Sequence, residues 1–73
     1  MSTTKTVDAR GLSCPQPAML ARQALDQLDG GTVEVLVDSE TAMDSVVRLA
    51  EVNGWRATVE RRTDGNFRLV LTR

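Results

Sequence analysis

The segment PQPAMLARQALDQLDGGTVEVLV, residues 15–37, decides the fold because it changes from a helical to a strand pattern across two glycines. Over residues 15–28, apolar side chains recur at steps of three and four, which predicts an amphipathic helix from about Pro15 to Leu28. Gly30 and Gly31 are expected to end this helix. Over residues 32–37, valines alternate with other residues, which predicts a half-buried strand.

The same two patterns continue on both sides of this segment. Thr6–Ala9 is expected to form a short strand before the first helix. Asp38 and Ser39 are capping residues that predict the start of a second helix, which runs over about Glu40–Asn53 with one apolar stripe.

Two more strands are expected near the C-terminal end, joined by a hairpin turn at Asp64-Gly65. Their residues alternate between apolar and polar side chains, so one face of each strand is predicted to join the core. The predicted core-facing residues are Trp55, Ala57, Val59, Phe67, Leu69 and Leu71.

The predicted order is therefore βαβαββ. A strand–helix–strand unit favours parallel neighbours, whereas the final hairpin is antiparallel. Because each helix has one apolar stripe and each strand one apolar face, we expect an α+β fold: a two-layer α/β sandwich with both helices on one face of a mixed four-stranded sheet. The 73 residues are expected to form a single domain, residues 1–73, with an ordered core over about 5–73.

Composition excludes several classes of function. The longest apolar run is Ala18–Ala21, too short for a membrane span, and Met1–Thr6 has no apolar stretch typical of a secretory signal, so a cytoplasmic protein is expected. The chain has no histidine and one cysteine, which excludes a His-activated nucleophile, an internal disulfide and a Cys-x-x-Cys pair. One thiolate cannot complete a tetrahedral zinc site, so a metal site on Cys14 would require an oligomer. We expect no metal and no cofactor.

Charge is unevenly distributed along the chain. Residues 1–54 carry four basic and eight acidic side chains, whereas residues 55–73 carry five arginines against two acidic residues. The basic end is interpreted either as the solvated face of two exposed strands or as a patch for an acidic partner.

The unusual part of the sequence is Asp8-Ala-Arg-Gly-Leu-Ser-Cys-Pro-Gln-Pro17. Pro15 and Pro17 suit the first turn of a helix, where the missing amide hydrogen has no intrahelical partner to lose. They therefore predict that Cys14 lies at the N-cap, where free N–H groups and the helix dipole favour the thiolate. Arg10 could add positive charge nearby. The alternative is that Cys14 is simply a small buried apolar residue.

A lone reactive thiol restricts the chemistry. Acyl transfer needs an adjacent base and disulfide exchange needs a second cysteine. Carrying sulfur as a persulfide needs neither, because one partner's persulfide loads the thiolate and another partner's thiolate unloads it. Selenium at the same thiolate remains an alternative to sulfur.

The motif Gly11-Leu-Ser-Cys-Pro-Gln-Pro17, read with Asp8 and Arg10, resembles the signature of the TusA/SirA-like sulfur-carrier family and is most similar to its YedF-like branch. The resemblance covers about residues 5–73. It implies that Cys14 bears the persulfide. The residues that match the rest of the motif and would shape the site are Asp8, Arg10, Gly11, Leu12, Pro15 and Pro17.

The resemblance also implies a set of partners. Members of the family take sulfur from a cysteine desulfurase or a rhodanese-type enzyme and pass it to an acceptor sulfurtransferase, in tRNA thiolation, molybdenum-cofactor maturation or sulfur oxidation. The protein would then act with partner enzymes rather than as a self-sufficient enzyme.

A second hypothesis is a non-catalytic interaction or regulatory module that uses the Cys14 loop and the open face of the sheet, where Leu36 and Val70 are expected. Direct binding of nucleic acid is not expected, because Trp55 and Phe67 are the only aromatic residues and both are predicted to lie in the core.

Overall fold

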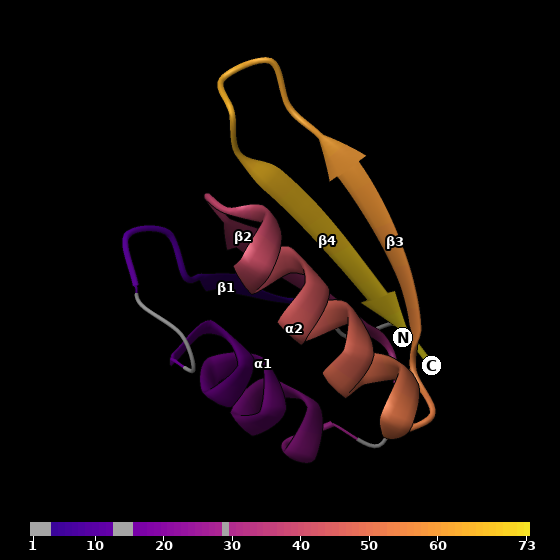
Figure 1. Ribbon diagram of the computed structural model, residues 1–73. Helices are drawn as coiled ribbons and strands as arrows, with labels where there is room; N and C mark the ends of the chain where they lie inside the picture. Colours follow the sequence, from indigo (N-terminus) through magenta and orange to yellow (C-terminus); the bar gives the residue numbers. More distant parts are fainter. Residues whose placement is uncertain (1–3, 13–15, 29) are drawn as a thin grey trace.

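The computed structural model describes residues 4–12, 16–28 and 30–73. Its elements follow the predicted βαβαββ order (Figure 1). They are β1 (Thr4–Asp8), α1 (Gln16–Asp26), β2 (Thr32–Val37), α2 (Glu40–Val52), β3 (Arg56–Arg61) and β4 (Phe67–Thr72).

The four strands form one mixed sheet in the order β1-β2-β4-β3. β1 pairs with β2 in parallel, and β4 pairs with both β2 and β3 in antiparallel fashion. Both helices lie on the same face of this sheet (Figure 1). The predicted two-layer α+β architecture is therefore confirmed.

The core lies between the sheet and the two helices. The valines of β2 are fully buried, as their alternation predicted, and they meet the apolar stripes of the helices because both layers turn their apolar sides inward. The residues with no exposed surface are Ala9, Ala21, Val33, Val35, Val37, Val46, Ala50, Leu69 and Leu71.

The predicted cap and turn are both present. Ser39 is the N-cap of α2, and its hydroxyl oxygen accepts a hydrogen bond from the N–H of Ala42 at 3.2 Å. The hairpin turn between β3 and β4 is closed by a bond from the N–H of Arg62 to the carbonyl oxygen of Asn66 at 2.9 Å, with Gly65 in the left-handed region at φ 86°.

The end of α1 differs from the prediction. The helix ends at Asp26, and the next two residues donate hydrogen bonds to carbonyls three residues back, as in a tightened last turn. Gly30 and Gly31 do not cap it. Instead, the N–H and C=O of Gly31 pair with the backbone of Arg73 at 3.2 Å, and a Cβ on Gly30 would approach the Arg73 oxygen at 3.3 Å.

Both edge strands also differ in detail. β1 begins at Thr4 and ends at Asp8, although Ala9 still donates a hydrogen bond to Leu36 at 2.8 Å. Trp55 is buried but precedes β3, and Val59 is 39% exposed rather than part of the core. The cause is that β3 lies at the edge of the sheet, where α2 covers it incompletely (Figure 1).

No helix in the described part of the chain is long and apolar enough to cross a membrane.

Two valine substitutions test this placement of the core. Val35→Ala removes two buried methyl groups from the fully buried face of β2, so we expect it to lower the free energy of unfolding by about 2–3 kcal/mol in urea titrations. Val59→Ala is the matched control on the exposed edge and should cost less than about 1 kcal/mol. Equal losses from the two variants would contradict the assigned core.

Candidate functional site

Most of the predicted site residues lie in the described part of the chain. The loop after β1 contains Arg10, Gly11 and Leu12, and Pro17 lies in the first turn of α1. Cys14 and Pro15 lie outside the described residues. The structure therefore defines both flanks of the cysteine motif.

Asp8 and Arg10 form a bidentate pair at the end of β1. The Nε and Nη2 atoms of Arg10 donate to the two carboxylate oxygens of Asp8 at 2.9 and 2.8 Å, and the Arg10 backbone N–H donates to Oδ1 at 3.2 Å. The hydrogen bond from the Arg10 side chain is the main cause that lowers the pKa of Asp8 to about 2. The positive charge of Arg10 is therefore paired with the carboxylate of Asp8.

Gly11 is held by a contact from a distant part of the sequence. Its N–H donates to Oδ2 of Asp38 at 2.8 Å, and its φ of 77° lies in the left-handed region. A Cβ at Gly11 would meet nothing within 4 Å, so the requirement for glycine is one of backbone conformation rather than space.

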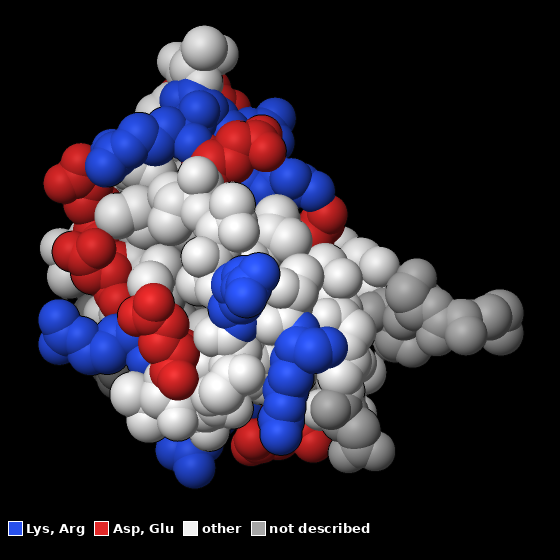
Figure 2. All heavy atoms as spheres, turned by 90° about the vertical axis from the view of Figure 1, so that its right-hand side faces the viewer, with Lys and Arg blue, Asp and Glu red and all other residues white. Residues whose placement is uncertain are grey.

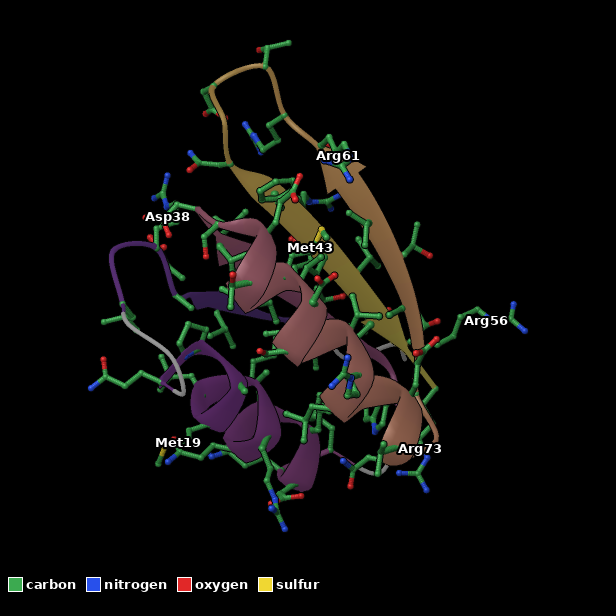
Figure 3. The ribbon with its side chains drawn as sticks, in the orientation of Figure 1. Met19, Asp38, Met43, Arg56, Arg61 and Arg73 are labelled. Carbon is green, nitrogen blue, oxygen red and sulfur yellow. The ribbon has the colours of Figure 1, made fainter. Side chains whose placement is uncertain are left out.

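Asp38 is a residue of the candidate site that the sequence analysis missed, because it was interpreted only as a helix cap. β1 and β2 are parallel, so their C-terminal ends meet at one edge of the sheet. Asp38 directly follows β2 and Gly11 follows β1, and Figure 3 shows Asp38 beside this loop. The sequence signal that could have identified Asp38 is a polar residue directly after the strand that pairs in parallel with β1.

Further charge gathers at the same end of the sheet. The pKa of Arg10 is raised first by its hydrogen bond to Asp8 and also by the negative charges of Asp64 and Asp38. Asp64 comes from the hairpin turn between β3 and β4. The loop that leads into the cysteine motif is thus tied to β1 by one carboxylate and to the end of β2 by another.

Pro17 anchors the other flank of the motif. It is fully buried, and in the first turn of α1 its missing N–H has no intrahelical acceptor to lose. The prediction that this proline fits the first turn is confirmed. α1 therefore begins at a position fixed by packing.

An apolar groove lies between the loop and α1. It is lined by Leu12, Gln16, Met19, Leu20 and Gln23. Leu12 is 36% exposed and Met19 is 56% exposed, and Figure 3 shows Met19 on the outer side of α1. The sequence analysis missed Met19. The signal that could have identified it is its place beside the apolar stripe of the helix rather than within that stripe.

The open face of the sheet offers less for a partner. Arg68 lies between Glu34 and Glu60 and forms an ion pair with each of them. Leu36 and Val70 are both half-buried, and they lie opposite Arg68 and Glu34 rather than opposite each other. A polar network therefore occupies the centre of this face.

The arginines of residues 55–73 are partly neutralised. Arg61 pairs with Glu40 at 3.2 Å and Arg68 pairs as described, while the guanidinium of Arg73 lies 5.9 Å from the ring centre of Trp55. Figure 2 shows basic side chains interspersed with acidic ones on the β3 side of the molecule. This pattern favours a solvated face over a dedicated basic patch.

The Asp8–Arg10 pair predicts a titration shift. In Arg10→Gln, the pKa of Asp8 should rise from about 2 toward 3.8, as measured by carboxyl carbon shifts. Because the folded pKa is below the unfolded one, the pair stabilises the fold above about pH 4, and this contribution is lost as the pH falls toward 2. An unchanged Asp8 pKa in the variant would contradict the pairing.

The Asp38 contact predicts a change in local protection. Asp38→Ala removes the acceptor of the Gly11 N–H, so hydrogen exchange at Gly11 should be faster by about fivefold. Asp38→Asn retains an oxygen acceptor and should preserve most of the protection. Asp44→Ala, an exposed carboxylate on α2, is the control and should have no effect at Gly11.

Known proteins resemble the chain over almost its entire length. Residues 5–73 match the family model described as sulfurtransferase TusA. A protein of Methanocaldococcus jannaschii, named as a candidate sulfur carrier, is 34% identical over 68 residues, which cover 92% of this chain and 91% of that protein. A similarly named protein of Archaeoglobus fulgidus is 33% identical over 69 residues, covering 92% and 90%.

The fold has a solved relative as well. The crystal structure of a SirA-like protein from Desulfitobacterium hafniense matches with a TM-score of 0.89 and 30% identity, and the match covers 96% of each chain. With an architecture of two helices on a mixed four-stranded sheet and a family match over residues 5–73, the chain belongs to the TusA sulfurtransferase family of sulfur carriers.

Proposed function

We propose that the protein carries sulfur as a persulfide on Cys14. The observation that carries this proposal is that a chain of the sulfur-carrier family has a single cysteine, and that this cysteine lies in the sequence between a tethered loop and the start of α1.

The proposed transfer involves no net oxidation. The Cys14 thiolate attacks the terminal sulfur of a donor persulfide, the donor S–S bond breaks, and the donor leaves as a thiolate while a new S–S bond forms on Cys14. A thiolate of the acceptor then attacks the terminal sulfur on Cys14 and releases the Cys14 thiolate. Each step needs an attacking thiolate and no histidine base.

The described residues support this proposal because they hold the two segments that flank Cys14 in the sequence. Asp8 with Arg10 and Asp38 with Gly11 hold the loop at the sheet edge, and Pro17 holds the start of α1. A thiolate before a helix N-terminus benefits from its free N–H groups, and so does the anionic terminal sulfur of a persulfide. Pro15 is compatible with this arrangement, because a proline in the first turn of a helix loses no intrahelical hydrogen bond.

Sulfur carriers work between a donor and an acceptor. For this protein we propose a cysteine desulfurase or a rhodanese-type enzyme as donor and a sulfurtransferase as acceptor. We place the exchange in the cytoplasm, where a lone thiol remains reduced.

A non-catalytic interaction module is the second candidate. The exposed Leu12 and Met19 favour it, because an apolar groove beside a loop can bind a partner without any chemistry. The two candidates differ in Cys14→Ser, which removes the carrier function and leaves a module intact.

Intact-mass spectrometry tests the carrier directly. After incubation with cysteine and a cysteine desulfurase, the protein should gain the mass of one sulfur atom, and a reductant should remove it. Cys14→Ser is the control for the attachment site and should gain nothing.

Loading that persists in Cys14→Ser would refute the assignment of the carrier residue. If neither the desulfurase nor thiosulfate with a rhodanese loads the wild-type protein, the carrier function is wrong and the interaction module replaces it.

A further inference from the structure

The outer edge of β1 presents backbone groups that pair with no other described residue. β1 is the first strand in the sheet order, with β2 as its described neighbour on one side only. The N–H of Ala9 donates to Leu36 of β2, and in a parallel pair the residues that face the neighbour alternate. Hence the backbone N–H and C=O groups of Lys5 and Val7 point toward β2, and those of Thr6 point outward, away from the sheet.

A groove runs beside this edge, between β1 and α1. Its apolar part is formed by Val7, Leu20 and Ala24, and its polar end by Lys5, Gln23 and Gln27. It shares Leu20 and Gln23 with the groove at Leu12 and Met19. The two grooves are therefore neighbours on the same side of α1.

Of the described residues that line this groove, Lys5 is the one that is basic. The Nζ of Lys5 donates to Oε1 of Gln27 and has no carboxylate partner among the described residues. Asp8, the other charged residue of the groove, is already paired with Arg10. A segment that lies in this groove would therefore gain by placing a carboxylate at Lys5.

The opposite edge of the sheet is different. β3 carries Arg56, Glu60 and Arg61 on a six-residue strand, and charged side chains on an edge strand discourage the addition of another strand. β1 also carries two charged side chains, Lys5 and Asp8, but Asp8 is paired with Arg10. The residues of β1 whose backbone groups point outward include Thr4 and Thr6, which suit a paired strand.

We propose that β1 accepts an extended segment of a partner protein as a fifth, antiparallel strand. Its side chains would alternate between the open face and the groove. The segment places an apolar side chain opposite Val7, against Leu20, and a carboxylate opposite Lys5, with one residue between them that pairs with the outward N–H and C=O of Thr6.

This proposal deepens the sulfur-carrier function by giving the partner a docking surface. An antiparallel segment has its N-terminal side at the Asp8 end of β1, where the loop toward the cysteine motif begins. The partner's chain would thus lie next to the groove lined by Leu12 and Met19.

The test uses synthetic peptides that contain no sulfur, with the full-length ¹⁵N-labelled protein. The first is acetyl-Thr-Val-Thr-Glu-Thr-amide, which places valine and glutamate on one side of a strand. The matched control, acetyl-Thr-Val-Glu-Thr-Thr-amide, has the same composition but places them on opposite sides. At millimolar concentration the first should shift the amide signals of Thr6 and Asp8 saturably, and the control should bind more weakly.

Variants of the protein test the mode of binding. Thr6→Pro removes an outward N–H without removing a bond to β2, and we expect about tenfold weaker binding. Val59→Pro is the matched control on β3. Because the N–H of Arg62 bonds to Asn66 and backbone directions alternate along an antiparallel strand, the N–H of Val59 also points outward from the sheet. The Val59→Pro protein should bind the peptide normally. Lys5→Glu should weaken binding by about fivefold, and a peptide with lysine in place of glutamate should restore it.

Thermal unfolding of each variant confirms that it is folded before binding is compared. Equal binding by Thr6→Pro and wild type, shifts centred on β3 or on the open face, or no saturable shift at all would each overturn the proposal. The peptides carry no thiol, so loss of sulfur loading with retained peptide binding refutes the carrier function alone, and the reverse refutes the docking surface alone.

Discussion

The parallel pairing of β1 with β2 is the constraint on which the rest of the structure depends. It requires a crossover, which α1 supplies, and it brings the C-terminal ends of both strands to one edge of the sheet. The loop after β1 and the residue after β2 therefore meet, and Asp38 can accept a hydrogen bond from Gly11 across 27 positions of sequence. The flank of the cysteine motif is thus fixed by the topology of the sheet.

The buried face of β2 makes that pairing stable. Its three valines are fully buried between the helices and the sheet, and β4 pairs along its other side. A shift of one residue in register would turn these valines to the open face, where Arg68 and its two glutamates lie. Burial on one face and ion pairs on the other therefore specify the same register.

The local elements could be predicted from the sequence because each has a local cause. The valine alternation of β2, the Ser39 cap and the Asp64-Gly65 turn depend on neighbouring residues alone, and all three are confirmed. Three features depend on distant contacts, and patterns of neighbouring residues did not predict them: Gly31 pairs with Arg73, Val59 lies beyond the cover of α2, and Asp38 holds Gly11.

The candidate site divides in the same way. The sequence motif predicted Asp8, Arg10, Gly11, Leu12 and Pro17 as site residues. The structure shows what holds four of them, whereas Leu12 is 36% exposed. The roles of Cys14 and Pro15 remain predictions. Helix periodicity places Met19 beside the apolar stripe of α1. The grooves along α1 and β1 became visible only in the structure, because periodicity does not show what lies beside a helix.

The central claim is that sulfur passes through Cys14, and the most direct measurement follows the sulfur atom itself. Cysteine labelled with radioactive sulfur and a cysteine desulfurase would load the protein, and digestion after alkylation would locate the label. The account predicts reductant-labile label in the peptide that contains Cys14 and its loss when an acceptor thiol is added. Label elsewhere in the chain, or label on Cys14 that no thiol removes, would contradict it.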